Sequence, residues 1–484
     1  MIMKNTLKNI CIVGAFLLPS VSFAQSRLDV PGLALGRSTV ASARGLDALM
    51  TNPASIGAES DRSFSFILPN LNLVYGNNFM TLKDMKFYFG GVGEDAQGDP
   101  IPRQLSDIER NKFAETIDGG RLVANNELMP LGLAVNIPGF GAVAFSISSY
   151  TQSNNLFPTG VSGLIKGDLG TRTVELGETS HSLLSYSAMQ LNYARELFAA
   201  DTNSNSRVKA FHIGLGVKYI RGFNYSHLDP GNYARIRPFV PEGWDSTYSW
   251  EVDMSYTTRS AGADYYNNFA PTGYLLGFGD AAGTGFGGDL GALLTLQQEN
   301  SNETSMAFGL SLMNLGFINW TEQASEFVIS VRDTINDVNQ IIESNSTLIP
   351  QFRGDRTNKQ FSSTLPMMMR LGGAFYLDQI FSGFTVPLVV STEYSQGFND
   401  IGINSTQPRF GLGLQYTSIG LIPTLRLGMQ FGGLEGMLWS GGLGWNINNA
   451  TQIDFSLGSL SVLTGVGSSK WMDFAFRIRA DIGI

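Results

Sequence analysis

The feature that most constrains this chain is a regular alternation of apolar and polar residues in segments of about 10 to 14 residues. Successive side chains of a β-strand point to opposite faces, so this pattern predicts strands with one apolar and one polar face. It recurs at 248–257, 409–417 and 424–431. In the last segment the apolar face holds Phe474, Phe476, Ile478, Ala480 and Ile482, and the other holds Asp473, Arg477, Arg479 and Asp481.

Two architectures satisfy such alternation. A soluble sandwich buries the apolar face, whereas a transmembrane barrel turns that face toward lipid and lines its interior with the polar one. The segments suit a tilted membrane-spanning strand of roughly 9–11 residues better than an average soluble strand of roughly five or six. Aromatic residues such as Tyr248, Trp250 and Tyr416 stand at segment ends, where interfacial girdles belong. We therefore predict an all-β fold, a closed antiparallel transmembrane β-barrel over residues 61–484.

Bacterial single-chain barrels have an even number of strands, and we predict about 14 here. Candidate strands include 84–90 and 246–258. A periplasmic C-terminus places short turns at 379–383, 418–420 and 448–449 on the periplasmic side and long loops at 259–283 and 316–363 outside. The stretch 222–245 then falls on the periplasmic side, where a long connection is unexpected, so a strand pair hidden there is one explanation. A capping box of Ser106 and Glu109 predicts a short helix near 105–117.

The first 24 residues have the features of a cleavable export signal. Lys4 and Lys8 precede an apolar stretch from Ile10 to Leu18, and Ser22-Phe23-Ala24 forms a small-x-small cleavage site. Export predicts an outer-membrane location for a β-barrel. The chain's one cysteine, Cys11, lies inside this signal, and the net charge of −9 makes nucleic acid an unsuitable partner.

No catalytic constellation is evident, so we predict no enzyme activity, no metal and no cofactor. His181, His212 and His227 lack metal-ligand spacing, and the glycine-rich stretch 283–288 lacks the Gly-Lys-Ser/Thr ending of a phosphate loop.

Charged residues on the polar faces of the strands are expected to line the barrel interior, where opposite signs pair or, alternatively, select a polar solute. They are Glu251, Asp253, Asp289, Arg370, Glu393, Arg409, Arg426, Asp454, Arg477, Arg479 and Asp481. The mixture of signs argues against a simple ion-selective pore. Phe476→Arg places a charge toward lipid and is expected to cost far more stability than Arg477→Gln, which changes an interior side chain.

Residues 25–60 lack alternation and are rich in Ala, Gly and Ser. They contain Asp47-Ala48 and then Asn52-Pro53-Ala54-Ser55-Ile56, and Asn-Pro by itself is a common turn. In its position between signal and first strand, this pattern resembles the N-terminal hatch of FadL-like outer-membrane barrels. Gly285-Phe286-Gly287-Gly288-Asp289 and Leu312-Met313-Asn314-Leu315-Gly316 are similar to strand motifs of a Bacteroidetes branch of unknown function, related to the type IX secretion attachment-complex barrel.

The resemblance implies a hatch or plug at 25–60 with Asp47, Asn52, Pro53 and Ala54 as its anchoring residues. It also implies a passive channel for small hydrophobic molecules, surrounded by outer-membrane lipid. The alternative function is an accessory barrel that does not transport and instead docks an envelope or secreted protein through its outer loops.

Overall fold

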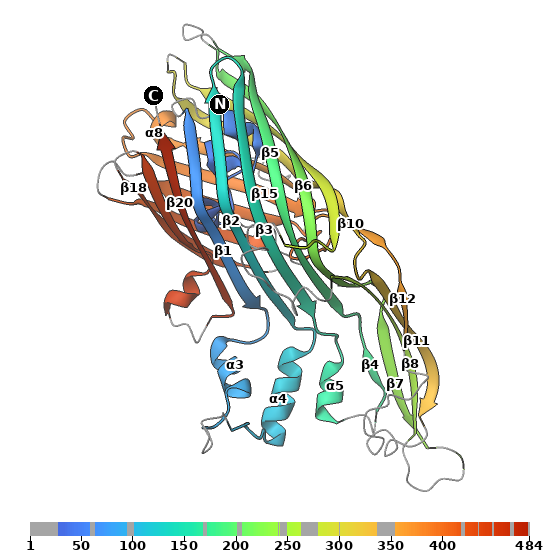
Figure 1. Cartoon of the computed structure of the whole chain (residues 1–484). Coiled ribbons are helices and arrows are strands. Elements are labelled where there is room, and N and C mark those ends of the chain that lie inside the picture. The colour runs from blue at the N-terminus through green and yellow to red at the C-terminus, as the bar shows by residue number, and fades with distance from the viewer. Residues whose placement is uncertain are drawn as a thin grey trace, which may run out of the picture.

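A computed structural model describes residues 28–58, 63–93, 101–167, 172–200, 206–240, 242, 249–262, 279–299, 301–335, 354–417, 422–433, 435–447, 450–464 and 469–482. The predicted signal peptide, 1–24, lies outside them. Fourteen antiparallel strands form one closed ring (Figure 1). In ring order they are β1 (Phe64–Asn77), β2 (Arg121–Ile137), β3 (Gly141–Leu156), β5 (Ser180–Ala199), β6 (Val208–Leu228), β9 (Gly283–Gln297), β10 (Thr304–Trp320), β14 (Met368–Tyr376), β15 (Leu388–Gly397), β16 (Arg409–Tyr416), β17 (Thr424–Gly432), β18 (Leu438–Ile447), β19 (Thr451–Leu457) and β20 (Trp471–Ile482).

The ring closes between the first strand and the last. β20 pairs with β1 in antiparallel register from Phe64↔Ile482 to Gly76↔Trp471, so the barrel has no free sheet edge at this seam. The predicted closed barrel of 14 strands is confirmed.

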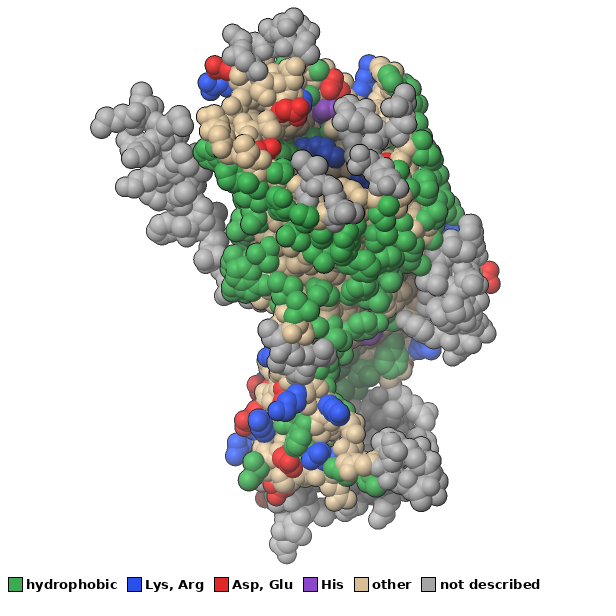
Figure 2. Space-filling view, turned by 90° about the vertical axis from the view of Figure 1, so that its left-hand side faces the viewer, with side chains coloured by type: hydrophobic (Ala, Val, Ile, Leu, Met, Phe, Trp, Pro, Cys, Tyr) green, Lys and Arg blue, Asp and Glu red, His purple; other side chains and the backbone are tan. Residues whose placement is uncertain are grey.

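Side chains alternate between the two surfaces of the wall as the sequence pattern predicts. On β16 and β17, Leu412 and Leu425 point outward with 41% and 45% of their surface exposed, whereas Arg409 and Arg426 point inward and are buried. Figure 2 shows the outward residues as a broad apolar band between two ends where charged side chains gather. An apolar outer band around a polar interior is the arrangement that a lipid bilayer stabilises, so the barrel is a transmembrane one of the outer-membrane type.

One end of the barrel has short turns and the other carries long connections. The C-terminal end of β20 lies opposite the end that carries α3 (Leu82–Phe89), α4 (Asp107–Ile117) and α5 (Val161–Lys166) (Figure 1). Because transmembrane barrels combine short periplasmic turns with longer extracellular loops, we assign the helical end to the outside. Two short elements, α8 (Leu377–Ile380) and η6 (Leu460–Thr464), complete the connections. Among the described residues no helix is long and apolar enough to span a membrane.

The predicted helix near 105–117 is confirmed, with Ser106 and Glu109 forming its capping box. The predicted strand at 84–90 is wrong, because this segment is helix α3. Thr81 and Asp84 cap its start reciprocally, and this local hydrogen bonding favours a helix over the strand indicated by the Phe-Tyr-Phe sequence.

An extracellular sheet continues beyond the ring on one side (Figure 1). Its strands pair in the order β4 (Val174–Leu176), β7 (Tyr233–Phe239), β8 (Ser249–Ala261), β11 (Ser325–Ile335) and β12 (Asp355–Asn358). A further strand, β13 (Phe361–Thr364), extends the line of β14 along β10.

This sheet corrects three predictions. β8 pairs mainly with β7 and β11, so Glu251 and Asp253 do not line the lumen and Trp250 does not belong to a membrane girdle. Within the stretch 222–245, the end of β6 and all of β7 lie on the extracellular side, because β8 does not cross the membrane and therefore does not reverse the side. The period-2 pattern does not distinguish a strand of the barrel wall from a strand of the extracellular sheet, because apolar and polar residues alternate in both. Tyr248 lies outside the described residues.

Candidate functional site: the barrel interior

Residues 28–58, here called the N-terminal segment, lie inside the barrel. The segment contains three short helical turns: α2 (Val30–Ala34), η1 (Gly45–Ala48) and η2 (Pro53–Ala58). Strand hydroxyls hold its backbone, since Ser456 Oγ donates to the Val30 carbonyl at 2.6 Å and Ser311 Oγ donates to the Thr51 carbonyl at 2.6 Å. The segment therefore contacts walls on opposite sides of the ring.

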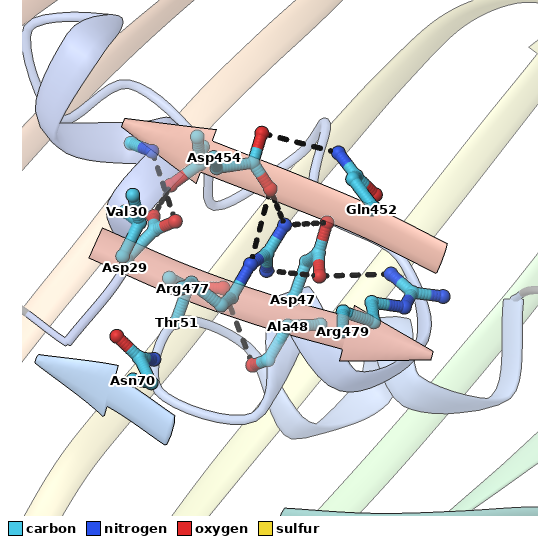
Figure 3. Close-up of polar contacts among 12 residues, drawn as sticks. Asp29, Val30, Asp47, Ala48, Thr51, Asn70, Gln452, Asp454, Arg477 and Arg479 are labelled. Atoms are coloured by element: carbon cyan, nitrogen blue, oxygen red, sulfur yellow. Dashed lines mark hydrogen bonds and ion pairs between the residues drawn. The ribbon is translucent and has the colours of Figure 1, made fainter. Parts of the chain in front are cut away.

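A network of buried charges ties η1 to the last strands. Arg477 lies between Asp47 and Asp454, and its Nη2 is 2.6 Å from Asp454 Oδ2 (Figure 3). Arg479 Nη1 is 2.8 Å from Asp47 Oδ1, and Arg426 Nη1 is 2.6 Å from Asp454 Oδ1. Each carboxylate thus faces two guanidinium groups, which compensates the desolvation of charges buried inside the barrel.

Two more ion pairs hold the first part of the segment. Glu393 pairs with Arg370 at 2.6 Å and also accepts a hydrogen bond from the Val40 backbone N–H at 2.9 Å. Arg37 Nη2 lies 2.7 Å from Asp473 Oδ2, and both side chains are buried. The mixed charges on the lumen face therefore serve largely as paired anchors for the N-terminal segment.

Two carboxyl groups of the segment respond to burial in opposite ways. Burial opposes ionisation of Asp47, but the nearby Arg477 and Arg479 outweigh this cost and hold the pKa of Asp47 well below its ordinary value. Burial raises the pKa of Asp29 instead, because the Arg370 guanidinium and the hydrogen bonds from the Thr39 hydroxyl and the Gly32 backbone N–H offset the effect of burial only in part. Ionised Asp47 is therefore the anchor that electrostatics favours.

The residues of the Asn-Pro-Ala motif form a buried bridge. Asn52 Nδ2 donates to the Val40 carbonyl at 3.1 Å and to the Ala292 carbonyl of β9 at 3.0 Å, and Asn52 Oδ1 accepts from the Ala54 N–H at 3.1 Å. One amide side chain thus links two parts of the segment to the wall, as only a group that both donates and accepts can do. Pro53 begins η2, and Ala54 is fully buried.

Glycines in the wall allow this close approach. A Cβ atom at Gly291 would meet Asn52 Oδ1, one at Gly214 would meet the Pro53–Ala54 backbone, and one at Gly309 would meet the Val40 carbonyl. The same holds for Gly411, Gly413 and Gly428, which face Leu35 to Ser38. The sequence offered one signal for these contacts, the high glycine count of 56, but not which glycines make them.

Asp289 belongs to a separate buried cluster in the wall. Its Oδ1 lies 2.8 Å from Lys218 Nζ and accepts the backbone N–H of Asn314 at 2.7 Å, while its Oδ2 accepts from Gln190 at 2.7 Å. Asn314 has a positive φ of 59° at a register shift in β10. The cluster supports this irregular stretch of the wall and makes no contact with the N-terminal segment through these bonds.

Two further charged side chains are buried on the inner face of the wall. They are Arg409 and Asp481, and Arg479 Nε donates to Asp481 Oδ1 at 2.8 Å.

The extracellular half of the lumen has a mixed lining, in which polar side chains such as Asn125, Glu127 and Gln152 of β2 and β3 stand beside an apolar surface. Its apolar inner wall consists of buried side chains from β3, β5, β6, β10 and the link before β14: Tyr150, Leu184, Tyr186, Ile220, Tyr225, Ile318, Trp320 and Leu365. Tyr150 and Tyr186 stack with ring centroids 4.7 Å apart. Leu46 and Leu49 of the N-terminal segment belong to the same cluster, so the segment faces this wall from the periplasmic side.

A connection folds inward from the extracellular side. We call residues 398–408, between β15 and β16, the outer loop; its Ile403, Asn404 and Ser405 are buried. Ile403 packs with Val74 and Val123 of the opposite wall, and the Gly402 N–H donates to Ser182 Oγ at 2.8 Å. The lumen is thus covered from both ends.

Two cavities adjoin these covers. One of about 310 Å³ lies on the periplasmic side, between the N-terminal segment and β14–β20, and includes Arg44, Asp47 and Tyr376. The other, of about 430 Å³, lies at the outer mouth and includes Arg121, Leu156, His227 and Ile401 of the outer loop. They are separated by the segment and by the apolar inner wall.

His181 and His227 lie on the paired strands β5 and β6, where Ser182 is the register partner of His227, whereas His212 lies further along β6. His181 contacts Asn155 at 2.6 Å and Ser226 at 3.0 Å rather than the adjacent serine, and buried His212 lies 3.5 Å from Glu196. The described residues hold no group of histidines, cysteines and carboxylates that could bind a metal ion.

A family model described as a family of unknown function, DUF5723, matches residues 53–432. The chain belongs to DUF5723. The DUF5723 match begins at Pro53 and ends with β17, so it includes the apolar inner wall and the outer loop but not Asp47 or Arg477. No curated protein matches the sequence of this DUF5723 member.

Solved structures similar to this DUF5723 chain include two described as toluene transporters and one described as a FadL homologue. They are the toluene transporter TbuX of Ralstonia pickettii (12% identity, 94% of this chain and 98% of that chain, TM-score 0.39), the toluene transporter TodX of Pseudomonas putida (12%, 96% and 98%, 0.41) and a FadL homologue of Pseudomonas aeruginosa (11%, 96% and 100%, 0.25).

Proposed function

We propose that this protein is a passive outer-membrane channel for small hydrophobic molecules, with residues 25–60 acting as its hatch. The observation that carries the proposal is the apolar inner wall. A barrel interior that serves water-soluble solutes is polar along its length. Here Tyr150, Tyr186 and Trp320 belong to an apolar surface that lies between the N-terminal segment and the outer loop. Apolar lining with few polar groups is the usual character of a site for a hydrophobic ligand.

The proposed path begins at the outer cavity, where Leu156 and Ile401 offer apolar contacts. Movement of the outer loop admits the molecule to the apolar inner wall. It leaves either past the N-terminal segment into the periplasmic cavity or sideways into the membrane, as the FadL-like resemblance implies. Asp47, Asn52, Pro53 and Ala54 hold the hatch in place, and the barrel does no chemistry on its cargo.

The test compares two neighbouring leucines of β5. Leu184 faces the lumen and Leu183 faces outward. Cells that produce the Leu184→Ser variant are expected to take up radiolabelled toluene several-fold more slowly than cells with the wild type, because the change introduces a hydroxyl into the apolar wall. Leu183→Ser is the matched control and is expected to leave uptake unchanged. Equal uptake by cells with and without the wild-type protein would rule out the channel.

The extracellular sheet favours a second candidate function, an accessory barrel that docks an envelope or secreted protein. β7, β8 and β11 extend past the ring and present charged side chains such as Arg235, Arg237 and Arg332 to solvent. Removal of residues 325–358 takes away β11 and β12. Under the docking function this deletion abolishes capture of the partner, whereas under the channel function toluene uptake persists.

A further inference from the structure

Helix α3 keeps large apolar side chains exposed, although Tyr88 and Phe89 also contact the Phe113 ring of α4, at centroid distances of 4.9 Å and 5.8 Å. None of its eight residues is buried, although its sequence, Leu-Lys-Asp-Met-Lys-Phe-Tyr-Phe, is half aromatic or aliphatic. Phe89 exposes 68% of its surface and Phe87 exposes 37%. Large apolar side chains grouped on a surface mark a contact with another molecule or with a membrane.

The helix continues the lipid-facing surface of the barrel. α3 begins five residues after the end of β1, and the Leu82 backbone N–H donates to the Ser469 carbonyl at 3.1 Å, next to the start of β20. The last outward residues of the wall here are Tyr75 on β1 and Leu122 on β2, both exposed. α3 therefore lies at the level where the apolar band meets the extracellular surface (Figure 1).

Cations accompany these aromatic residues. Lys83 and Lys86 are exposed on α3 and form no ion pair among the described residues, and the Arg103 guanidinium lies 4.3 Å from the centre of the Phe87 ring. Figure 2 shows Lys and Arg side chains below the apolar band, with Asp and Glu side chains among them.

Among the residues that the structure describes, the carboxylates next to α3 already have hydrogen-bond or ion-pair partners. Asp84 caps α3 together with Thr81, and Glu109 caps α4 together with Ser106; these hydrogen bonds lower the pKa of both carboxyl groups. Asp107 pairs with Arg110 at 2.8 Å. Lys83 and Lys86 therefore have no ion-pair partner among the described residues and can meet an external anion, and Arg103, which also interacts electrostatically with Glu109, lies beside them.

We propose that α3, through Lys83, Lys86, Arg103, Phe87 and Phe89, binds anionic lipid of the outer leaflet, with the cations on phosphate groups and the two phenylalanines among the acyl chains. Basic and aromatic residues on one short helix at a membrane surface are the combination that holds a helix in the interface. Its continuity with the lipid-facing wall favours lipid over a protein partner. The inference is independent of what the barrel transports.

The test uses a dye on α3 in the full chain. Cys11, the chain's one cysteine, is changed to Ser and Phe89 to Cys, which is labelled with acrylodan, a dye whose emission shifts to the blue in an apolar environment. The protein is reconstituted into phosphatidylcholine vesicles with increasing fractions of lipid A. We expect a blue shift that saturates with lipid A. In the variant K83Q/K86Q/R103Q we expect half-saturation to need about fivefold more lipid A for each cation removed.

The matched control removes three exposed cations elsewhere, in R332Q/R356Q/K359Q on the extracellular sheet, and is expected to titrate like the unsubstituted labelled chain. Heat-modifiability on a gel checks that each variant folds. Three outcomes would overturn the proposal. An equal shift without lipid A would indicate simple apolar insertion, and the same shift with inorganic phosphate in phosphatidylcholine vesicles would indicate a free-phosphate site. A shift that depends on protein density would indicate contact between copies of the chain.

Discussion

The two halves of the lumen are closed by different physical means. On the periplasmic side the N-terminal segment is held by buried ion pairs around Asp47 and Arg477 and by backbone lying directly on wall glycines such as Gly291. On the extracellular side the outer loop is held by the packing of Ile401 and Ile403 and by neutral hydrogen bonds such as that from Gly402 to Ser182.

The two closures differ in the free energy that is needed to withdraw them from the lumen. Withdrawal of the segment breaks several buried charge pairs at once, and each such break costs several kcal/mol when a charge stays buried. Withdrawal of the outer loop exposes two aliphatic side chains, Ile401 and Ile403, each worth up to roughly 1.5–3 kcal/mol, and breaks neutral hydrogen bonds worth roughly 1 kcal/mol each. We therefore expect the outer loop to open readily and the segment to stay in place.

The largest effect is expected at Arg477, the centre of the buried ion-pair network that joins Asp47 to Asp454; this network is here called the inner lock. Arg477→Gln leaves Asp47 and Asp454 facing each other without the guanidinium group between them, and loss of one partner of a buried ion pair costs about 3–5 kcal/mol. Urea unfolding in detergent measures the loss. Arg207→Gln removes an exposed ion pair with Glu299 and is the control. Equal stabilities of the two variants would show that the network is not an anchor.

A charge on the outer face of the same strand tests the wall alone. Phe476 points toward lipid and packs on Phe455 at 4.9 Å, so Phe476→Arg is expected to cost about 2–4 kcal/mol if the site lies near the midplane. This change leaves the inner lock intact, so conductance in planar bilayers is expected to match the wild type in the fraction that folds. An increased conductance would mean that wall and lock are coupled.

A smaller effect is expected from filling one wall glycine. Gly291→Ala places a methyl group against Asn52 and the Pro53 ring, and overpacking of this kind costs about 1–3 kcal/mol. We expect the segment to loosen while the barrel stays folded, giving higher or noisier single-channel conductance. Gly373→Ala is the matched control, because its Cβ would meet atoms no closer than 3.4 Å. Identical conductance traces for the two variants would mean that the contact between Gly291 and Asn52 does not hold a hatch.

The outer cover is tested by cross-linking rather than by loss of stability. In a Cys11→Ser background, Val74→Cys with Ile403→Cys joins the outer loop to β1 across a packed contact. Toluene uptake is expected to fall on oxidation and to recover with reductant, with little change in unfolding. Equal toluene uptake by the oxidised and the reduced variant would mean that the outer loop does not need to move.

The smallest expected effect is that of pH. The pKa of Asp47 is lowered in the folded protein, so the stability it contributes is present above the ordinary aspartate pKa of about 4 and is lost as pH falls below it. Asp29 has the opposite sign, because its pKa is raised: its contribution is present below about 4 and is lost as pH rises through the raised value. Between pH 5 and 8, conductance is therefore expected to show no opening due to Asp47. Opening in that window, abolished by Asp47→Asn, would contradict this assignment.

Local pattern determined much of the barrel before any tertiary contact was known. Alternation along β20 fixed which residues face lipid and which face the lumen, because a strand has two faces and one residue per step. The capping box at Ser106 fixed the start of α4 in the same way, since its hydrogen bonds join residues three apart. The Asn-Pro-Ala motif pointed to the segment whose Asn52 reaches β9.

Tertiary structure alone decided what the polar faces do. Glu251 and Arg477 have the same alternating context, yet Glu251 lies on the extracellular sheet while Arg477 is buried between Asp47 and Asp454. From the sequence, Arg477→Gln is expected to cost little stability, whereas from the structure it is expected to cost the most of the changes considered. The reason is physical: alternation reports the face of a strand, whereas burial and pairing depend on residues more than 400 positions away along the chain, brought together when the ring closes around the N-terminal segment.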